Sequence, residues 1–252
     1  VEGLDLGIGA MKESMAFIGV DMAWKIDGNH SGVAVLEGNA RGARLVAHSD
    51  GLLSQEAIIE YIKTHAKRNT VLAIDASLIV NNATGQRACE RLIGQAIGLY
   101  GASCHSTSRN RRYWETGPRL VKELKNLGFS ADFDLANTTR RPGRWLFEVY
   151  PHPAMVRMFR LDSIIRYKKG SVPKKREGLA TLRQHLERLA ADEAGELGSP
   201  PLLRELLSRD LALLRGEAMK RYQDTLDAVF CAYLASLSGV NYSCRRIASV
   251  TI

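Results

Sequence analysis

The chain is poor in cysteine and has no long apolar segment. Its four cysteines show no paired spacing such as C-x-x-C, which argues against a cysteine-rich metal site and against a disulfide framework. No run approaches the ~20 apolar residues that span a membrane, and no basic start followed by a long apolar stretch indicates a secretion signal. A cytoplasmic protein without membrane contact is therefore expected.

Internal repeats and low-complexity segments are also absent, so the 252 residues predict one large domain or two small ones. What the chain has in excess is positive charge, with 35 Lys and Arg against 27 Asp and Glu and a formal net charge of +8. This balance is compatible with a polyanionic partner such as nucleic acid, although many basic cytoplasmic proteins bind none.

The basic residues concentrate in three runs, at 108–114, 139–145 and 166–176. Two of these place Tyr or Trp beside arginines, a combination that suits stacking on nucleobases. Solvated loops are the alternative interpretation of each run. The candidate substrate-binding residues are Arg87, Arg109, Arg111, Arg112 and Lys168.

The hydrophobic pattern predicts an ordered series of elements after a lead-in at 1–15. Three strands, at 15–21, 31–38 and 43–50, form an antiparallel meander whose second turn contains Asn and Gly. The later predicted elements are a helix at 54–68, a strand at 70–78, helices at 85–100 and 117–130, a strand at 144–151, helices at about 175–192, 201–215 and 217–237, and a tail at 245–252 that could add an edge strand.

This order of elements is typical of the ribonuclease H-like fold, an α/β fold with a mixed five-stranded sheet flanked by helices. We therefore expect a single domain over residues 16–252. Helical insertions at about 80–143 and 160–216 would be added to the basic plan.

Carboxylates stand at the ends of two predicted strands. The run FIGVD ends on Asp21, and the run VLAID ends on Asp75. A carboxylate at the end of a buried strand is costly to desolvate unless a positive charge compensates it. In the predicted closing helix, Asp224 and Asp227 are three residues apart and therefore share one helical face.

Taken separately, Asp224 could be a cap and Asp227 could pair with an arginine. Together with the two strand-end acids they predict a metal site, because unpaired carboxylates held close together repel and take up protons. Hard oxygen ligands favour Mg²⁺ or Mn²⁺ over Zn²⁺. Two such ions about 4 Å apart could activate a water molecule and stabilise the leaving oxygen of a phosphodiester.

Four further residues have roles that the pattern leaves open. Glu148, inside a predicted strand, is a candidate catalytic carboxylate. His152 could donate a proton to a leaving oxygen, or it could pack in a turn between two prolines. Arg87 could flank the site or form a helix-face salt bridge, and Lys168 could face either solvent or a phosphate.

The acidic pattern resembles the Holliday-junction resolvase branch of the ribonuclease H-like superfamily. That resemblance rests on Asp21, an acid on the fourth strand and the D-x-x-D pair; the usual glutamate on the fourth strand is Asp75 here, which shortens its reach. Longer motifs are similar to the domain of unknown function 429 family, described as predicted ribonuclease H-like nucleases. These motifs are GVDMAW, AIDASLIVNNATGQRACER, FEVYPHPAMV, YKKG and DTLDAVFCAYLA, and the similarity extends over nearly the whole chain from about residue 16.

The residues and the resemblance together predict a divalent-metal-dependent nuclease that hydrolyses phosphodiester bonds of DNA or RNA. A non-catalytic nucleic-acid-binding or scaffold protein with the same fold is the main alternative. An ATP-dependent phosphotransferase is a weaker one, because the stretch MAWKIDGNHSG after Asp21 lacks the glycine-rich turn that cradles phosphate.

Overall fold

The fold is centred on a six-stranded mixed sheet. The computed structural model describes residues 14–25, 28–39, 42–131, 142–191 and 201–239. The strands are β1 (Met15–Asp21), β2 (Ser31–Asn39), β3 (Gly42–Leu52), β4 (Thr70–Asp75), β5 (Phe129–Ser130) and β6 (Arg144–Glu148). They lie in the order β3-β2-β1-β4-β6-β5. Strand β2 is antiparallel to both β1 and β3, whereas β4, β6 and β5 run parallel to β1.

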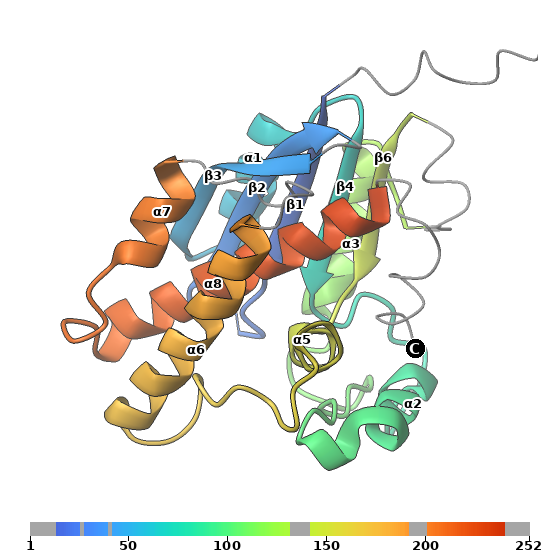
Figure 1. The fold of residues 1–252 in the computed structure, drawn as a ribbon. Coiled ribbons are helices and arrows are strands. Elements are labelled where there is room, and N and C mark those ends of the chain that lie inside the picture. The colour runs from blue at the N-terminus through green and yellow to red at the C-terminus, as the bar shows by residue number, and fades with distance from the viewer. Residues whose placement is uncertain (1–13, 26–27, 40–41, 132–141, 192–200, 240–252) are drawn as a thin grey trace, which may run out of the picture.

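Helices cover both faces of this sheet. They are α1 (Gln55–His65), α2 (Ala88–Ile97), a short 3₁₀ helix η2 (Gly98–Tyr100), α3 (Thr116–Asn126), α5 (Pro151–Phe159), α6 (Val172–Ala191), α7 (Pro201–Ser208) and α8 (Gly216–Gly239). In Figure 1, α8 crosses one face with α6 and α7 beside it, α1 and α3 lie on the other face, and α2 lies beyond the strand ends. This arrangement confirms the expected α/β class and is consistent with a ribonuclease H-like fold.

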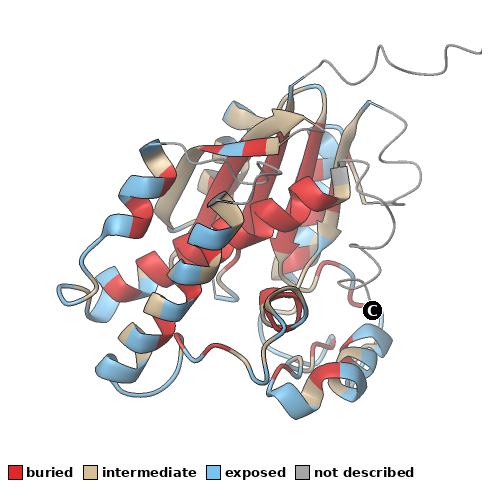
Figure 2. Cartoon of the chain, in the orientation of Figure 1, coloured by how far each residue is buried: buried red, intermediate tan, exposed pale blue. Residues whose placement is uncertain are grey.

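Two apolar cores fill the spaces between these layers. One core joins the sheet to α5, α6, α7 and α8, and the other joins it to α1 and α3. Figure 2 shows the central strands and most of α8 as buried, while the outer faces of the surrounding helices are exposed. Within the described ranges no helix is long and apolar enough to cross a membrane.

Two glycines let α8 lie directly on the sheet. A Cβ atom at Gly19 in β1 would come within 2.1 Å of the backbone of α8, at the oxygen of Ala228 and the nitrogen of Ala232. A Cβ atom at Gly32 in β2 would come within 2.2 Å of the backbone oxygen of Asp224. Contacts this short exclude any side chain, so these positions fix how α8 crosses β1 and β2.

The structure departs from the predicted elements in several places. The strand predicted at 70–78 ends at Asp75, and the helix predicted at 117–130 ends at Asn126, so that its last two predicted positions form β5 instead. The strand predicted at 144–151 ends at Glu148, because Pro151 begins helix α5, where a proline at the first helical position loses no hydrogen bond. The helix predicted at 201–215 ends at Ser208. The sixth strand, β5, is a two-residue addition beside β6. The predicted lead-in up to residue 13, the basic residues Arg140 and Arg141, and the predicted tail strand lie outside the described residues.

Candidate functional site

Asp21 and Asp75 lie side by side at the carboxyl ends of β1 and β4. The two strands are parallel neighbours, and these residues are partners in their register. In β1, Phe17 packs in the core under α8, whereas Ile18 packs in the core under α1 and α3. Since side chains alternate along a strand, Asp21 faces α8 as Phe17 does. The same count from Val71 in β4 places Asp75 on that face too.

Helix α8 brings two more carboxylates to the same place. Asp224 is 1% exposed and Asp227 is fully buried. The backbone of α8 at Asp224 touches β2 at Gly32, whose register partner in β1 is Asp21. The charge of Asp21 acts on the pKa of Asp224, Asp227 and Asp75. The structure therefore brings the four predicted aspartates, Asp21, Asp75, Asp224 and Asp227, into one acidic cluster.

Lys168 is the principal cation of the acidic cluster. Its Nζ atom lies 3.2 Å from Oδ2 of Asp21 and also forms an ion pair with Asp227. The preceding residue, Tyr167, is fully buried and donates a hydrogen bond from its hydroxyl to Asp227. The backbone oxygen of Tyr167 accepts a hydrogen bond from Gln223 of α8 at 2.5 Å, which ties this segment to the helix.

The pKa values of the two strand-end acids, Asp21 and Asp75, are shifted in opposite directions. Burial raises the pKa of Asp75 well above its ordinary value, and the charge of Asp21 raises it further. Burial also acts to raise the pKa of Asp21, but the charges of Lys168 and Lys220 outweigh it and leave that pKa lowered. Asp21 is therefore the carboxylate of this pair that stays charged at neutral pH.

The two acids on α8 titrate close to neutrality. Burial raises the pKa of Asp227 to about 6, against the charge of Lys168. Burial and the charge of Asp21 raise the pKa of Asp224 to about 7, although Lys220, one helical turn earlier, pairs with it. The Oδ2 atom of Asp224 is buried and accepts no hydrogen bond. Four carboxylates thus share two lysines, and the excess charge is suppressed by protonation.

The donor chemistry of the acidic cluster fits a divalent cation, but its present spacing does not. Carboxylate oxygens are the ligands that Mg²⁺ and Mn²⁺ take, and Asp224 offers one without a partner. In the part of the chain that the structure describes, however, no three carboxylate, imidazole or thiol groups are arranged to hold one ion. The ammonium group of Lys168 contacts both Asp21 and Asp227 instead. An ion could bind there only if Lys168 moved aside.

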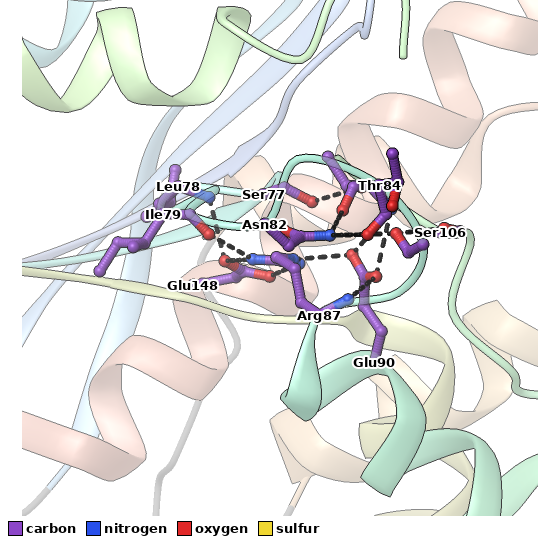
Figure 3. Close-up of polar contacts among 11 residues, drawn as sticks. Ser77, Leu78, Ile79, Asn82, Thr84, Arg87, Glu90, Ser106 and Glu148 are labelled. Carbon is purple, nitrogen blue, oxygen red and sulfur yellow. Dashed lines mark hydrogen bonds and ion pairs between the residues drawn. The ribbon is translucent and has the colours of Figure 1, made fainter. Parts of the chain in front are cut away.

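Glu148 and Arg87 form a bidentate ion pair next to the acidic cluster. The Nη1 and Nη2 atoms of Arg87 lie 2.8 and 2.6 Å from the two Glu148 oxygens, and Glu148 also accepts the N–H of Leu78 at 3.0 Å (Figure 3). The Nε atom of Arg87 lies 2.7 Å from buried Glu90. We call Arg87, Glu90 and Glu148 the arginine clamp. Its internal bonds already engage both predicted side chains, so the catalytic role of Glu148 and the substrate-binding role of Arg87 stay predictions.

His152 lies in the first turn of α5 and faces the same region. Its ring centre is 5.5 Å from that of Tyr167. Burial and the charge of Lys168 lower the pKa of His152 to about 4. The ring is therefore neutral at pH 7 and a weak base, which disfavours the predicted role as a proton donor.

The predicted arginines Arg109, Arg111 and Arg112 are exposed in the segment before α3. The backbone of Arg109 bonds to the oxygen of Asn82 in the loop after β4, so this segment lies near the end of that strand. Lys168, in contrast, is mostly shielded from solvent by the acids that it contacts. The pairing of Lys220 with Asp224 was not predicted, although a lysine four residues from an aspartate on one helix was an available signal.

Comparison with known proteins gives one match. The family model described as "Protein of unknown function (DUF429)" matches residues 19–244. No curated protein and no solved structure matches the chain. The matched range contains all four members of the acidic cluster, the arginine clamp and Lys168. The chain belongs to the DUF429 family.

Proposed function

We propose that the protein is a divalent-metal-dependent phosphodiester hydrolase that acts on DNA or RNA. One observation carries the proposal: two parallel strand ends and one helix face direct four carboxylates into a single buried cluster. A cluster with this cost in desolvation is rarely kept for stability alone, since burial disfavours each charge in it. The net charge of +8 and the exposed arginines beside the cluster support a polyanionic substrate.

In this proposal Asp21, Asp75, Asp224 and Asp227 hold Mg²⁺ or Mn²⁺. The bound ion would supply a Lewis acid for the phosphate and a water of lowered pKa. Lys168, displaced from the carboxylates, would keep its ammonium group beside the cluster, where it can contact a phosphate oxygen.

The test is a cleavage panel with purified protein. Labelled single strands, duplexes and branched junctions of DNA and RNA are incubated with Mg²⁺, with Mn²⁺ or with EDTA. We expect metal-dependent cleavage of at least one form, and its loss in Asp227→Asn. Asp162→Asn, which changes an exposed aspartate, is the matched control and should cleave as wild type does. Absence of cleavage of every form, or full activity in Asp227→Asn, would refute the proposal.

One observation favours a second candidate, a nucleic-acid-binding protein without turnover. Lys168 already lies against Asp21 and Asp227, as an internal cation does in a site that needs no metal. This candidate predicts tight binding of DNA or RNA that Mg²⁺ does not change, with no product in any lane of the same panel.

A further inference from the structure

A hollow lined by aromatic and basic side chains opens at the same edge of the sheet as the acidic cluster. It is a shallow, open depression and not an enclosed cavity, because the space of about 350 Å³ within its rim includes open solvent. The lining residues come from three segments. They are Met22 and Trp24 after β1, Ala76 and Ser77 after β4, and residues of the segment 107–117, which leads into the first turn of α3. Met22 directly follows Asp21 and Ala76 directly follows Asp75, so the hollow lies at the same strand ends as the cluster, but on the face of the sheet that packs against α1 and α3.

Three aromatic side chains, Trp24, Tyr113 and Trp114, belong to the lining of this hollow. Trp24 is 49% exposed and Tyr113 is 38% exposed, which is unusual for side chains of this size. The guanidinium carbon of Arg112 lies 5.0 Å from the centre of the Tyr113 ring. Arg111 in the same lining is exposed as well. Aromatic faces and cations are thus presented together.

The backbone around Tyr113 is held in an unusual conformation. Tyr113 has φ 64°, in the left-handed region that a tyrosine rarely adopts. Close by, Gly117 lies so near the loop after β4 that a Cβ atom there would be 2.1 Å from the oxygen of Ser77. The hydroxyl of Thr116 donates to the oxygen of Trp24 at 3.2 Å, which joins the segment after β1 to the start of α3.

The arginine clamp fixes the other end of this segment. Both carboxylate oxygens of Glu90 accept the N–H of Thr107, at 3.2 and 3.1 Å. The hydroxyl of Ser77 donates to Thr107, and Asn82 donates to the backbone oxygen of Thr107 (Figure 3). The walls of the hollow are therefore tied to the ends of β1 and β4, and the clamp acts on the site by holding them in place.

We propose that this hollow binds one unpaired nucleobase of the substrate, so that the protein selects single-stranded or locally opened nucleic acid; this rests on the proposed function and names the substrate form. A base stacks on exposed aromatic faces whatever its sequence, which is the chemistry that Trp24 and Tyr113 offer. The linked phosphates would meet Arg111 and Arg112. A base inside a duplex is already stacked and paired, so it cannot enter.

The lining of the hollow favours a nucleobase over a purely acidic ligand. Its aromatic side chains, Trp24, Tyr113 and Trp114, offer a stacking surface that a free carboxylate or phosphate would not use. Arg111 and Arg112 can meet the phosphates that are linked to a stacked base. An apolar peptide side chain would fill the hollow but would leave Arg111 and Arg112 without partners.

Binding measured in EDTA tests this directly, because no metal-dependent cleavage can then occur. The probe is a short fluorescein-labelled single strand of DNA or RNA with 2-aminopurine at one position, beside the matching duplex. The diagnostic variant is Tyr113→Gly, since glycine adopts φ 64° without strain and the fold should keep its melting temperature. We expect about 5- to 150-fold weaker single-strand binding, which corresponds to about 1–3 kcal/mol of stacking, and loss of 2-aminopurine quenching.

Two controls make the result specific. Tyr113→Phe keeps the ring and should bind as wild type does, and Tyr100→Ala removes a half-exposed tyrosine outside the hollow and should change nothing. Equal single-strand affinity in Tyr113→Gly and wild type, or no preference of the wild type for single strands over duplex, would overturn the proposal. If binding follows Tyr113 but the cleavage panel shows no product, the hydrolase proposal fails and the base-binding hollow stands. Cleavage that does not depend on Tyr113 refutes the hollow alone.

Discussion

Replacing Asp227 by asparagine should make the protein more stable and, under the proposed function, should also remove metal-dependent cleavage. Asp227 is fully buried, and its pKa is about 6 in the folded protein against an ordinary value of 3.8. The difference of about 2 units corresponds to about 3 kcal/mol at neutral pH, lost because folding desolvates the charge. This free-energy difference already includes the attraction between Lys168 and Asp227, because that attraction is one of the effects that set the pKa of Asp227. Asparagine can still accept the hydrogen bond of Tyr167 but has no charge to desolvate, so the free energy of unfolding at neutral pH should rise by up to about 3 kcal/mol.

The pH dependence gives the sign of the effect. The folded protein holds the Asp227 proton more tightly than the unfolded chain does. Below about pH 3.8 the side chain is protonated in both states, so Asp227 does not lower the free energy of unfolding there. As the pH rises from about 3.8 towards about 6, the charge on Asp227 lowers the free energy of unfolding more and more, and above about pH 6 this loss is constant. Wild-type stability should therefore fall across this window, and Asp227→Asn should fall less.

Urea denaturation followed by tryptophan fluorescence, in EDTA and over this pH window, measures both quantities. The difference between the two curves reports the titration of Asp227 together with its effect on the neighbouring acids of the cluster, which titrate in both proteins. Asp162→Asn controls for a general effect of removing one negative charge. A less stable Asp227→Asn at neutral pH, or two parallel curves, would show that Asp227 is a net stabilising ion-pair partner and would refute this account.

Three other changes probe the fold, the proposed metal site and the proposed substrate-binding surface. Gly19→Ala would put a methyl group 2.1 Å from the α8 backbone and should lower the free energy of unfolding by about 3 kcal/mol or more, whereas Gly94→Ala, with open space around it, should not; thermal melts that coincide would contradict the close packing of α8. Lys168→Gln removes the cation that competes for the carboxylates and should tighten Mn²⁺ binding by about tenfold or more in calorimetry; unchanged affinity would mean that Mn²⁺ binds elsewhere. Replacing Arg111 and Arg112 together by alanine should weaken binding to all sequences alike and make the salt dependence shallower by about 2 in slope; an unchanged slope in a salt titration would remove them from the phosphate-binding surface.

The sequence contained the positions of the acids but not their partners. Asp21 and Asp75 are predictable, because each ends an apolar run whose alternation sets its face and whose strands are neighbours in this fold. Lys168 is 147 residues from Asp21 in sequence, and only the path from α5 to α6 brings it to the cluster. Helix α5 was missed because two prolines after Glu148 indicate the end of a strand equally well as the start of a helix.

The roles of Glu148 and of the aromatic residues were hidden for a different reason. The sequence around a glutamate in a strand looks the same whether its carboxylate is free or paired with an arginine. It also does not show which arginine pairs with Glu148. Tyr113 and Trp114 were predicted to stack on bases from their neighbours alone. Trp24 lines the same hollow as these two residues. This arrangement depends on how the segment before α3 packs against the ends of β1 and β4, and local sequence patterns do not encode that packing.

The crossing of α8 over β1 has a consequence for synthesis of the chain. Domains fold from the amino-terminal end as they are made, but here half of the acidic cluster lies on the last described helix. Until α8 leaves the ribosome, the helix that covers Asp21 and Asp75 in the folded protein is missing. The α8 backbone then cannot pack against Gly19 and Gly32. The buried acidic cluster therefore forms only after α8 has been made, so a nascent chain would lack the complete site on which the proposed function depends.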